Sequence, residues 1–551
     1  MCVYDIIIVN SPCSAFRRRG AGHRPFLEEK IMKRRMIILI SVMILILLSA
    51  FSCKRAHSGD DGALAGTGTI VSNYSVGLEF APYKGNSEYR LIGIGTCKDK
   101  DIYVPPTYLG LPVTSVDAKA FEKEYIDSIS LPSSILTVGK RAFAECTIKS
   151  VTFSEGLTEI GQEAFFDCRI LTEALIPASV EKLGDSVFSG CRSLKKLEFA
   201  YKSSLREIPK YAFLGCSALC EVIFPESFGI TRIGNNAFAS CSSLKSITFT
   251  GECALTETSS GAFADCSSLE TFSFPAETPL RAIKGSAFAR CTKLKGVDLP
   301  DSLVSVEAYA FSFCTSIKSL HIGKDLIDIS SLAWTMCDLD TVTVDKENSF
   351  WESTGNCLLS SGGTVLALGT NNSVIPETVT KIDAYAFAGL TSLTEITLPE
   401  KLSTISDWAF TKTSLRKITI PDSVKQIGMG AFSECTFLES ILFEEKSSCT
   451  SIGSLAFNAT AITSILLPSS ITTVGEHAIC ACDGLKEVTI LDSGSASMSN
   501  PISHCMSLEV IRFSGSTERW REIENIHGED WYISCPNVKV ICSDGTVTYN
   551  R

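Results

Sequence analysis

The fold of this chain is decided by the stretch Ala237-Phe238-Ala239-Ser240-Cys241-Ser242-Ser243-Leu244-Lys245-Ser246-Ile247-Thr248-Phe249. Its Ala-Phe-x-x-Cys motif returns along the chain, and neighbouring copies are 22 to 25 residues apart except across one interruption. The aromatic position is filled by Phe121, Phe143, Phe165, Phe188, Phe213, Phe238, Phe263, Phe288, Phe311, Trp334, Phe387, Phe410, Phe432 and Phe457, and then by Ile479 and Ile502. Such a period predicts a solenoid, because one repeat cannot bury its own apolar face and must share a core with its neighbours.

The second half of each repeat predicts a half-buried strand. Leu244, Ile247 and Phe249 are apolar, and Ser246 and Thr248 lie between them, so the end of the stretch alternates with a period of two. The Ala-Phe part is expected on a short helix or turn at the opposite side. Counting these strands gives sixteen coils and a sheet roughly 80 Å long at the usual strand spacing.

These repeats resemble the leucine-rich repeats of the BspA type, found on bacterial surfaces. The resemblance covers residues 74–550: the segment from Leu91 to Val116 is similar to that family's first coil, and the segment from Trp520 through Trp531 to Thr546 is similar to its closing part. It implies an α/β-type leucine-rich repeat solenoid, mostly β-strand with short helix or turn segments. It implies no catalytic motif and no cofactor.

The front of the chain predicts export. A basic stub at Met32–Met36 is followed by sixteen apolar or small residues up to Phe51, and then by Ser52 and Cys53. This order is typical of a signal peptide with a lipobox-like cleavage site, so we expect Cys53 to become the N-terminus and carry lipid. The alternative is a plain membrane anchor, although sixteen residues fall short of the ~20 that span a bilayer.

The domain organisation follows from these signals. The expected parts are an extension from a start codon assigned too early (1–31), a lipoprotein signal peptide (32–52), a flexible tether (53–70), N-terminal capping strands (71–117), a first repeat block (118–344), a β-hairpin insert (345–376), a second repeat block (377–513) and a C-terminal cap (514–551). The predicted location is the bacterial envelope, at the outer membrane or cell surface, with the lipid on Cys53 in the membrane.

Twelve of the 23 cysteines recur three residues after the aromatic position. They are Cys146, Cys168, Cys191, Cys216, Cys241, Cys266, Cys291, Cys314, Cys337, Cys435, Cys482 and Cys505. Disulfides or a metal array would also use periodic cysteines, but we favour a buried ladder of reduced thiols, since free cysteine behaves as a small apolar residue. A serine at Cys241 would then bury a hydroxyl with no assured partner. Cys535 and Cys542 lie outside the ladder and are a candidate local disulfide.

The interruption between Trp334 and Phe387 predicts a hairpin. Two apolar stretches, 357–359 and 365–368, flank Ser-Ser-Gly-Gly. It is either a protruding binding element that carries Phe350 and Trp351, or a structural break in the sheet, and we favour the break.

The sequence contains no motif typical of nucleic-acid binding, nucleophilic catalysis or metal binding. Fifty basic against 61 acidic side chains give a net charge of −11 without a basic stripe, which argues against nucleic acid as a partner. The six histidines have no spacing typical of a nucleophile pair, and Cys480 and Cys482 lack the second pair of a zinc site. We therefore expect no catalytic residues, no metal and no enzyme activity.

The remaining candidate is the outward side of the sheet. The candidate ligand-binding residues there are Lys196, Glu198, Thr248, Asp298, His321, Thr343, Thr397 and Thr419, with Trp351 on the hairpin. The resemblance implies an adhesin or protein-binding scaffold whose partners are extracellular matrix or other cell-surface macromolecules. The alternative is a structural envelope protein without a host ligand, since threonine also suits a solvated sheet for its own sake.

Overall fold

The computed structural model describes residues 74–225, 229–250, 254–274, 278–360, 362–494, 497–498, 500–527, 535 and 538–549, with backbone alone at 524–527. The chain divides into two compact units, Met1–Val71 and Ser72–Arg551. The predicted signal peptide, Cys53 and the tether lie outside the described residues, as does Trp531. In the described part, no helix has both the length and the apolar character needed to cross a membrane.

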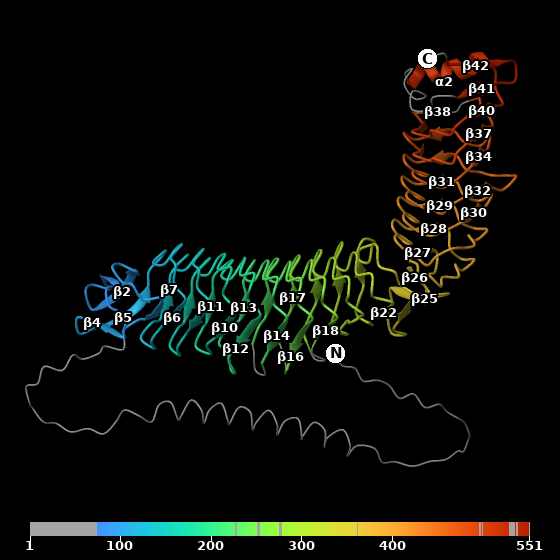
Figure 1. Ribbon diagram of the computed structural model, residues 1–551. Coiled ribbons are helices and arrows are strands. Elements are labelled where there is room, and N and C mark those ends of the chain that lie inside the picture. Colours follow the sequence, from blue (N-terminus) through green and yellow to red (C-terminus); the bar gives the residue numbers. More distant parts are fainter. Residues whose placement is uncertain are drawn as a thin grey trace, which may run out of the picture. The chain divides into compact units, whose positions relative to one another are not determined.

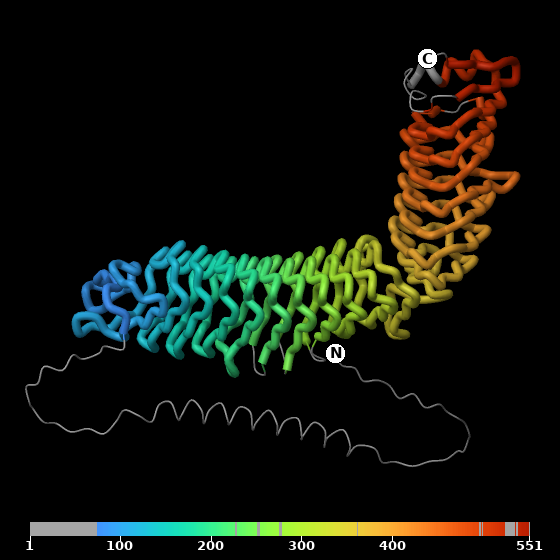
Figure 2. Tube along the Cα trace, viewed as in Figure 1, coloured from blue at the N-terminus to red at the C-terminus, as the bar shows by residue number. Residues whose placement is uncertain are grey.

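Each repeat folds into one coil with three sides, and the coils stack on one another (Figures 1 and 2). The first side is a strand that pairs in parallel with the strands of neighbouring coils, and we call these strands the strand row. The row holds β3 (Asp101–Tyr103), β6 (Ser128–Ser130), β8 (Ser150–Thr152), β10 (Glu173–Ile176), β12 (Lys196–Phe199), β14 (Glu221–Phe224), β16 (Ser246–Phe249), β18 (Thr271–Ser273), β20 (Val297–Asp298), β22 (Ser319–Ile322), β24 (Thr341–Val344), β30 (Lys417–Ile420), β32 (Ser440–Phe443), β34 (Ser464–Leu467), β37 (Glu487–Ile490), β40 (Val510–Phe513) and β41 (Lys539–Ile541).

The predicted fold class is confirmed, with about 18 turns against the sixteen expected. Two members of the strand row, β3 and β41, extend it beyond the repeats at either end by pairing with β6 and β40. Pairing along the row stops between β20 and β22, at the interruption, and between β32 and β34. The coil after the interruption differs from the expectation: its segment Leu393–Leu398 alternates like the others but forms no strand.

The second side of each coil is a two-residue strand that ends just before a turn. These strands form the short row: β7 (Thr137–Val138), β9 (Glu159–Ile160), β11 (Lys182–Leu183), β13 (Glu207–Ile208), β15 (Arg232–Ile233), β17 (Glu257–Thr258), β19 (Ala282–Ile283), β21 (Ser305–Val306), β23 (Asp328–Ile329), β28 (Lys381–Ile382), β29 (Thr404–Ile405), β31 (Gln426–Ile427), β33 (Ser451–Ile452), β35 (Thr473–Val474) and β38 (Ser497–Met498). Only one residue of each pair points inward, as Leu183 does in β11.

The third side carries the Ala-Phe motif, and in the described residues it is a turn rather than a helix. We call it the turn row. In most coils three N–H groups donate to carbonyls of the next coil, as Ser186, Phe188 and Gly190 donate to residues 210, 212 and 214 at 2.8–3.0 Å. The residues two before and two after the aromatic have positive φ in most coils, for example Asn236 (φ 52) and Ser240 (φ 60) on either side of Phe238. At the end of the row, β36 (Ile479–Cys480) pairs with β39 (Ile502–Ser503).

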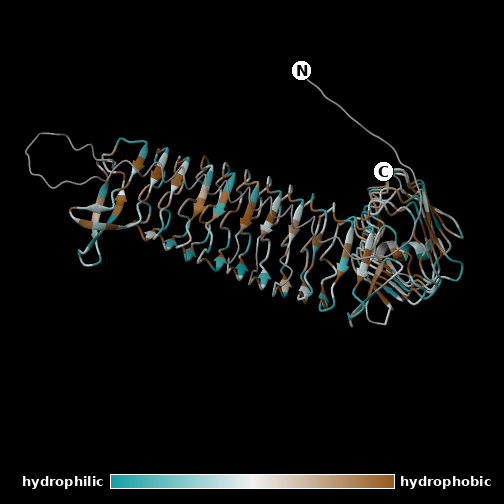
Figure 3. Cartoon of the chain, turned by 90° about the horizontal axis from the view of Figure 1, so that it is seen from below, coloured by the Kyte–Doolittle hydropathy of each residue, from teal (hydrophilic) through white to brown (hydrophobic). Residues whose placement is uncertain are grey.

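The core is a column of stacked rings. Neighbouring rings from Phe121 to Phe311 are nearly parallel, with centroids 4.9–5.6 Å apart, and Trp334 continues the stack. A second stack runs from Phe387 to Phe457. Figure 3, seen from below, shows that hydrophobic residues recur at corresponding places in successive coils.

The insert divides the apolar interior in two. It is a meander of β25 (Trp351–Thr354), β26 (Cys357–Ser360) and β27 (Val365–Leu368), and β27 then pairs with β28. Because side chains alternate along a strand, Leu358 joins the core of the first block, while Cys357 and Leu359 join that of the second. One strand thus closes the ends of two cores.

The ends of the stack are capped. At the front, β1 (Glu79–Tyr83), β2 (Glu88–Gly93), β4 (Thr107–Tyr108) and β5 (Leu111–Val116) form a small sheet that leads into the short row. At the back, β42 (Thr546–Thr548) pairs with β41, and α2 (Thr517–His527) covers the last coil. Trp520 of α2 is buried, contacts Phe513 edge-on, and donates from its indole N–H to Tyr549 at 2.8 Å.

Candidate functional site

The strand row presents a regular, solvated face. Along β12 the side chains of Lys196 and Glu198 are exposed while Leu197 and Phe199 are buried. The outward candidates Thr248, Asp298, His321, Thr343 and Thr419 are likewise exposed. The structure therefore brings these predicted residues to one side of the molecule.

Only some of the charges on this face are paired, since Glu173, Glu221 and Asp298 have no ion pair in the described residues. Lys196 Nζ lies 2.9 Å from Glu198 Oε1 on the same strand. Between coils, Lys295 lies 3.1 Å from Glu270, and Arg512 lies 2.8 Å from Glu487. His321 Nδ1 is 3.0 Å from Thr343 Oγ1, a partner that the sequence does not predict. Such exposed pairs add little stability because solvent screens them, but each pair cancels its own charge on the face.

The same face also exposes large apolar side chains. Leu175 on β10 is 53% exposed and Ile223 on β14 is 43% exposed. Leu442 on β32 and Leu466 on β34 are exposed to a similar extent. Since all four occupy outward positions of the strand row, none can help fill the core.

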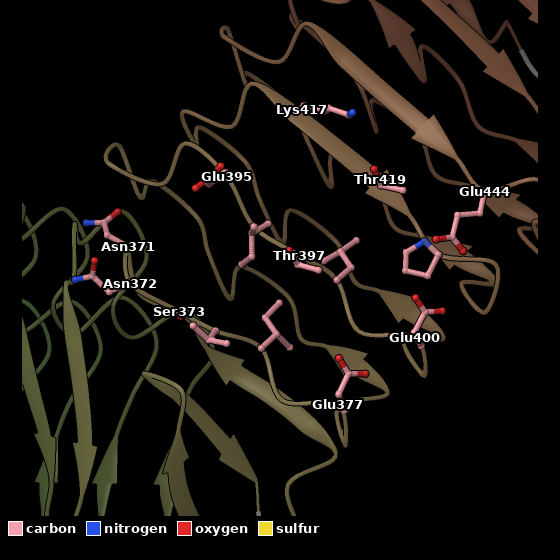
Figure 4. A pocket seen from close by; sticks show the side chains of 15 residues that line it. Asn371, Asn372, Ser373, Glu377, Glu395, Thr397, Glu400, Lys417, Thr419 and Glu444 are labelled. Atoms are coloured by element: carbon pink, nitrogen blue, oxygen red, sulfur yellow. The ribbon is translucent and has the colours of Figure 1, made fainter.

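A cleft opens where the strand row is broken. Its volume is about 810 Å³, and its walls come from the end of the insert (371–377), the strandless segment 395–400, β30 and Glu444. Thr397 and Thr419, two candidates from the sequence, line it, but Thr397 lies on irregular backbone and not on a strand. In Figure 4, Glu377, Glu400 and Glu444 gather at one end and Asn371 and Asn372 at the other.

Sequence reasoning missed this cleft. The segment Thr394–Leu398 keeps the alternation of a strand, so its local pattern gives no sign that it lacks partners. The one available signal was the long step from Trp334 to Phe387, which marks where regular stacking stops.

Asp338 ties three parts of the chain together beside the cleft. Its carboxylate accepts hydrogen bonds from Lys318 Nζ at 2.6 Å, from Asn371 Nδ2 at 2.9 Å and from the Thr391 backbone N–H at 3.0 Å. These residues belong to the first block, the insert and the second block. Burial alone would raise the pKa of Asp338, but the hydrogen bonds from Lys318 and Asn371 outweigh it and lower the pKa.

Trp351 lies where a structural break in the sheet would place it and does not protrude as a binding element. Its ring is half-buried and packs against the core of the first block, and it lines a 40 Å³ cavity together with Trp334 and Leu358. The insert needs an apolar side chain here because the last coil of the block would otherwise expose its core. Phe350 beside it is 49% exposed.

The twelve periodic cysteines are buried and form no disulfides. In ten coils from Cys168 to Cys482 the thiol donates to the aromatic residue's carbonyl in the preceding coil, at 3.0–3.3 Å. Cys241 thus donates to Phe213, so a serine hydroxyl here would have a partner, contrary to the expectation. Burial raises the pKa of Cys146, Cys216 and Cys266 to about 12, which keeps these thiols unreactive.

The described residues show no arrangement typical of metal binding. They contain no group of three or more His, Cys, Asp or Glu side chains that could hold a metal ion. His477 Nδ1 lies 2.7 Å from Ser503 Oγ, and Cys480 Sγ lies 4.0 Å from His504 Nδ1. No disulfide joins Cys535 to Cys542, which are both buried.

A protein-family model described as "BspA type Leucine rich repeat region (6 copies)" matches residues 114–245, 198–297, 231–355, 368–486 and 450–524. Among solved structures, the chain is similar to a leucine rich cell surface protein from Faecalibacterium prausnitzii, at 21% identity over 85% of this chain and 99% of the other, with a TM-score of 0.44. It is also similar to a leucine-rich repeat protein from Bacteroides ovatus, at 18% identity over 84% and 98%, with a TM-score of 0.42. No curated protein matches the chain.

Proposed function

Because the chain belongs to the BspA-type leucine-rich repeat family, we propose that it is a lipid-anchored surface protein that binds other macromolecules and acts as an adhesin. Members of this family are typically found at the cell surface. Leucine-rich repeat proteins are generally scaffolds rather than enzymes. The proposal adds three specific elements: a lipid on Cys53, a role in adhesion, and the absence of catalysis.

The observation that carries the binding role is the solvated strand row. It repeats the same outward positions from coil to coil, and it exposes Leu175 and Ile223 where a solvated sheet would favour polar residues. Weak contacts that repeat at regular intervals add up along an extended partner, since each later contact forms within one complex. The face carries no excess of basic side chains, which favours a protein partner over nucleic acid.

The binding role is tested by placing charge on the face. Leu175→Glu with Ile223→Glu should reduce retention on wells coated with fibronectin, laminin or collagen. The matched control is Leu136→Glu with Ile327→Glu, two similarly exposed apolar residues that lie off the strand row. Equal retention of both variants would contradict the proposed face, and absence of retention for the wild type would favour a structural envelope role.

The anchor is tested separately. Metabolic labelling with palmitate should tag the wild type and leave Cys53→Ala unlabelled. Equal labelling of both proteins would exclude Cys53 as the lipidated residue.

A further inference from the structure

The cleft beside the insert has open backbone edges. β30 pairs with β32 on one side only. On its other side lies the segment Glu395–Leu398, which forms no ladder with β30 in the described structure. The backbone bond between the two coils, from Arg416 N to Thr394 O at 3.1 Å, lies just before both segments. By contrast, β12 pairs with both neighbours. A strand with one free edge can accept the backbone of another chain.

The cleft also carries unbalanced negative charge. Glu377, Glu395, Glu400 and Glu444 line it, and Lys417 is the cation among its lining residues. Within the described residues, the carboxylates of Glu377, Glu395 and Glu400 make no hydrogen bond or ion pair, and Glu444 accepts only the backbone N–H of Asp422 at 2.9 Å. Elsewhere on the strand row, the carboxylates of Glu198 and Glu487 have basic partners, whereas those of Glu173 and Glu221 have none among the described residues.

Apolar side chains line the wall between these charges. Val374 is 73% exposed, although it is a β-branched apolar residue. Ile396 is partly buried beside it, and Leu398 and Ile375 are buried. The cleft therefore combines an acidic rim with an apolar wall, in a volume within the range of ligand-binding sites.

We propose that this cleft binds an extended basic peptide segment of another protein, which adds a strand beside β30. Its backbone would pair with the free edge, its Lys or Arg side chains would meet Glu377, Glu400 and Glu444, and its alternate apolar side chains would contact Val374 and Ile396. This proposal rests on the proposed binding function and names the chemistry of one partner. A divalent cation does not fit, since the carboxylates form no metal-holding group in the described residues, and phosphate-rich partners would be repelled.

Binding of a synthetic peptide to the full chain tests the proposal. The probe is a fluorescein-labelled peptide of sequence Lys-Val-Lys-Val-Lys-Val, followed by fluorescence anisotropy. Glu377→Gln with Glu400→Gln should weaken binding by about tenfold or more, because two charge contacts are lost. The matched control is Glu173→Gln with Glu221→Gln, two exposed carboxylates of the strand row without an ion pair in the described structure.

The pattern of results decides among the alternatives. Loss of affinity in the cleft variant alone, and weaker binding of a peptide N-methylated at alternate residues, would support strand addition in the cleft. Equal affinity of the cleft and control variants would overturn the site, and spermine that competes as well as the peptide would overturn a peptide partner. Glu377 and Glu400 are exposed and make no ion pair among the described residues, so the variant should keep the melting temperature of the wild type.

The result of the peptide test can be distinguished from the result of the adhesion test. If the peptide binds in the cleft but the whole protein is not retained on matrix-coated wells, the cleft assignment stands and the adhesin role fails. If the protein is retained through the strand row but the cleft variant binds the peptide as the wild type does, the adhesin role stands and the cleft assignment fails.

Discussion

The two repeat blocks have the same coil but differ in the side chains that fill its core. In the first block the ring column is unbroken from Phe121 to Trp334, and nine periodic cysteines run from Cys146 to Cys337. In the second block the rings stop at Phe457, and Ile479 and Ile502 take their place. There Leu390, Thr413 and Thr460 replace cysteine in three coils, and all three are buried.

This difference shows which features the coil requires. The turn row keeps its three hydrogen bonds in most coils of both blocks, as at Phe238 and at Phe457. The residue at the ring position can be aromatic or aliphatic. The residue three positions later can be cysteine, threonine or leucine. We infer that the backbone geometry of the turn row is specified tightly, whereas the ring stack, which ends at Phe457, can be replaced by aliphatic packing in the last coils of the second block.

The largest effect is expected from breaking the ring column of the first block. Phe238→Ala should lower the free energy of unfolding by about 3–5 kcal/mol, because the ring is fully buried and stacks on both Phe213 and Phe263. Phe457→Ile, in the block that already uses isoleucine in this slot, should cost less than half as much. Urea unfolding followed by circular dichroism measures both, and equal costs would contradict the inferred tolerance of the second block.

Alkaline pH should destabilise the chain through the buried thiols. Burial raises the pKa of Cys216 and Cys266 to about 12 in the folded chain, from 9.0 when exposed. The unfolded chain therefore loses these protons first, and stability is lost as the pH rises from 9 towards 12, by about 3 kcal/mol per thiol at pH 11.

The check is the urea midpoint between pH 8 and pH 11. Cys216→Ser with Cys266→Ser should flatten the decline, and Cys220→Ser should leave it unchanged because Cys220 is exposed. A decline that is as steep in the double variant as in the wild type would refute the role of these thiols.

Loosening the link between the blocks should have a smaller effect. Asp338→Asn removes the charge that holds Lys318, Asn371 and the Thr391 N–H, and should cost about 1–2 kcal/mol at pH 7. The folded state lowers the pKa of Asp338, so this contribution is present above pH 3.8 and is lost as the pH falls through the folded pKa. The two proteins should thus converge as the pH falls below 3.8, as thermal melts would show.

A matched control for this prediction is Asp301→Asn. Asp301 is 73% exposed and lies 3.9 Å from Lys324, so its removal should be nearly neutral. A cost for Asp301→Asn similar to that for Asp338→Asn would mean that the link at Asp338 has no special role.

The smallest effect concerns the backbone of the turn row. Gly215 has a φ of +71°, and a Cβ there would meet nothing within 4 Å, so Gly215→Ala isolates the conformational cost at about 1 kcal/mol. Ser240 holds the corresponding position of the next coil at φ 60, and Ser240→Gly should stabilise by a similar or smaller amount. Thermal melts that shift in the same direction for both variants would argue against backbone strain.

Local pattern predicted the repeating part of the structure well. The alternation in residues 196–199 correctly indicates which side chains face outward, and the Ser-Ser-Gly-Gly run correctly indicates the hairpin of β26 and β27. These features depend on residues close in sequence. The short hairpin of β25 and β26 was missed, although Gly355 and Asn356 both have the positive φ that a tight hairpin turn requires.

What the pattern could not predict depends on neighbouring coils. Leu393–Leu398 alternates but has no partner strand in the described structure, because the insert replaces the preceding coil. The thiol of Cys241 finds the Phe213 carbonyl only through the register of stacking. Trp351 packs against the core of the first block because that core ends at the insert. Cys53 and the predicted anchor remain predictions from the sequence.

The turn row has an electrostatic consequence. Its N–H groups donate towards the later coil throughout the described residues, so the peptide dipoles, each about 3.5 D, are aligned along the stack as they are in a helix. The carbonyl pole lies at the first coil, where Lys119 and Lys123 are exposed, and the N–H pole lies at the last, beside Asn500. At the insert a bond from Met336 to Ala388 carries the alignment across. A polarised column of this kind gives the two ends of the molecule opposite preferences for charged groups, independently of the side chains on its faces.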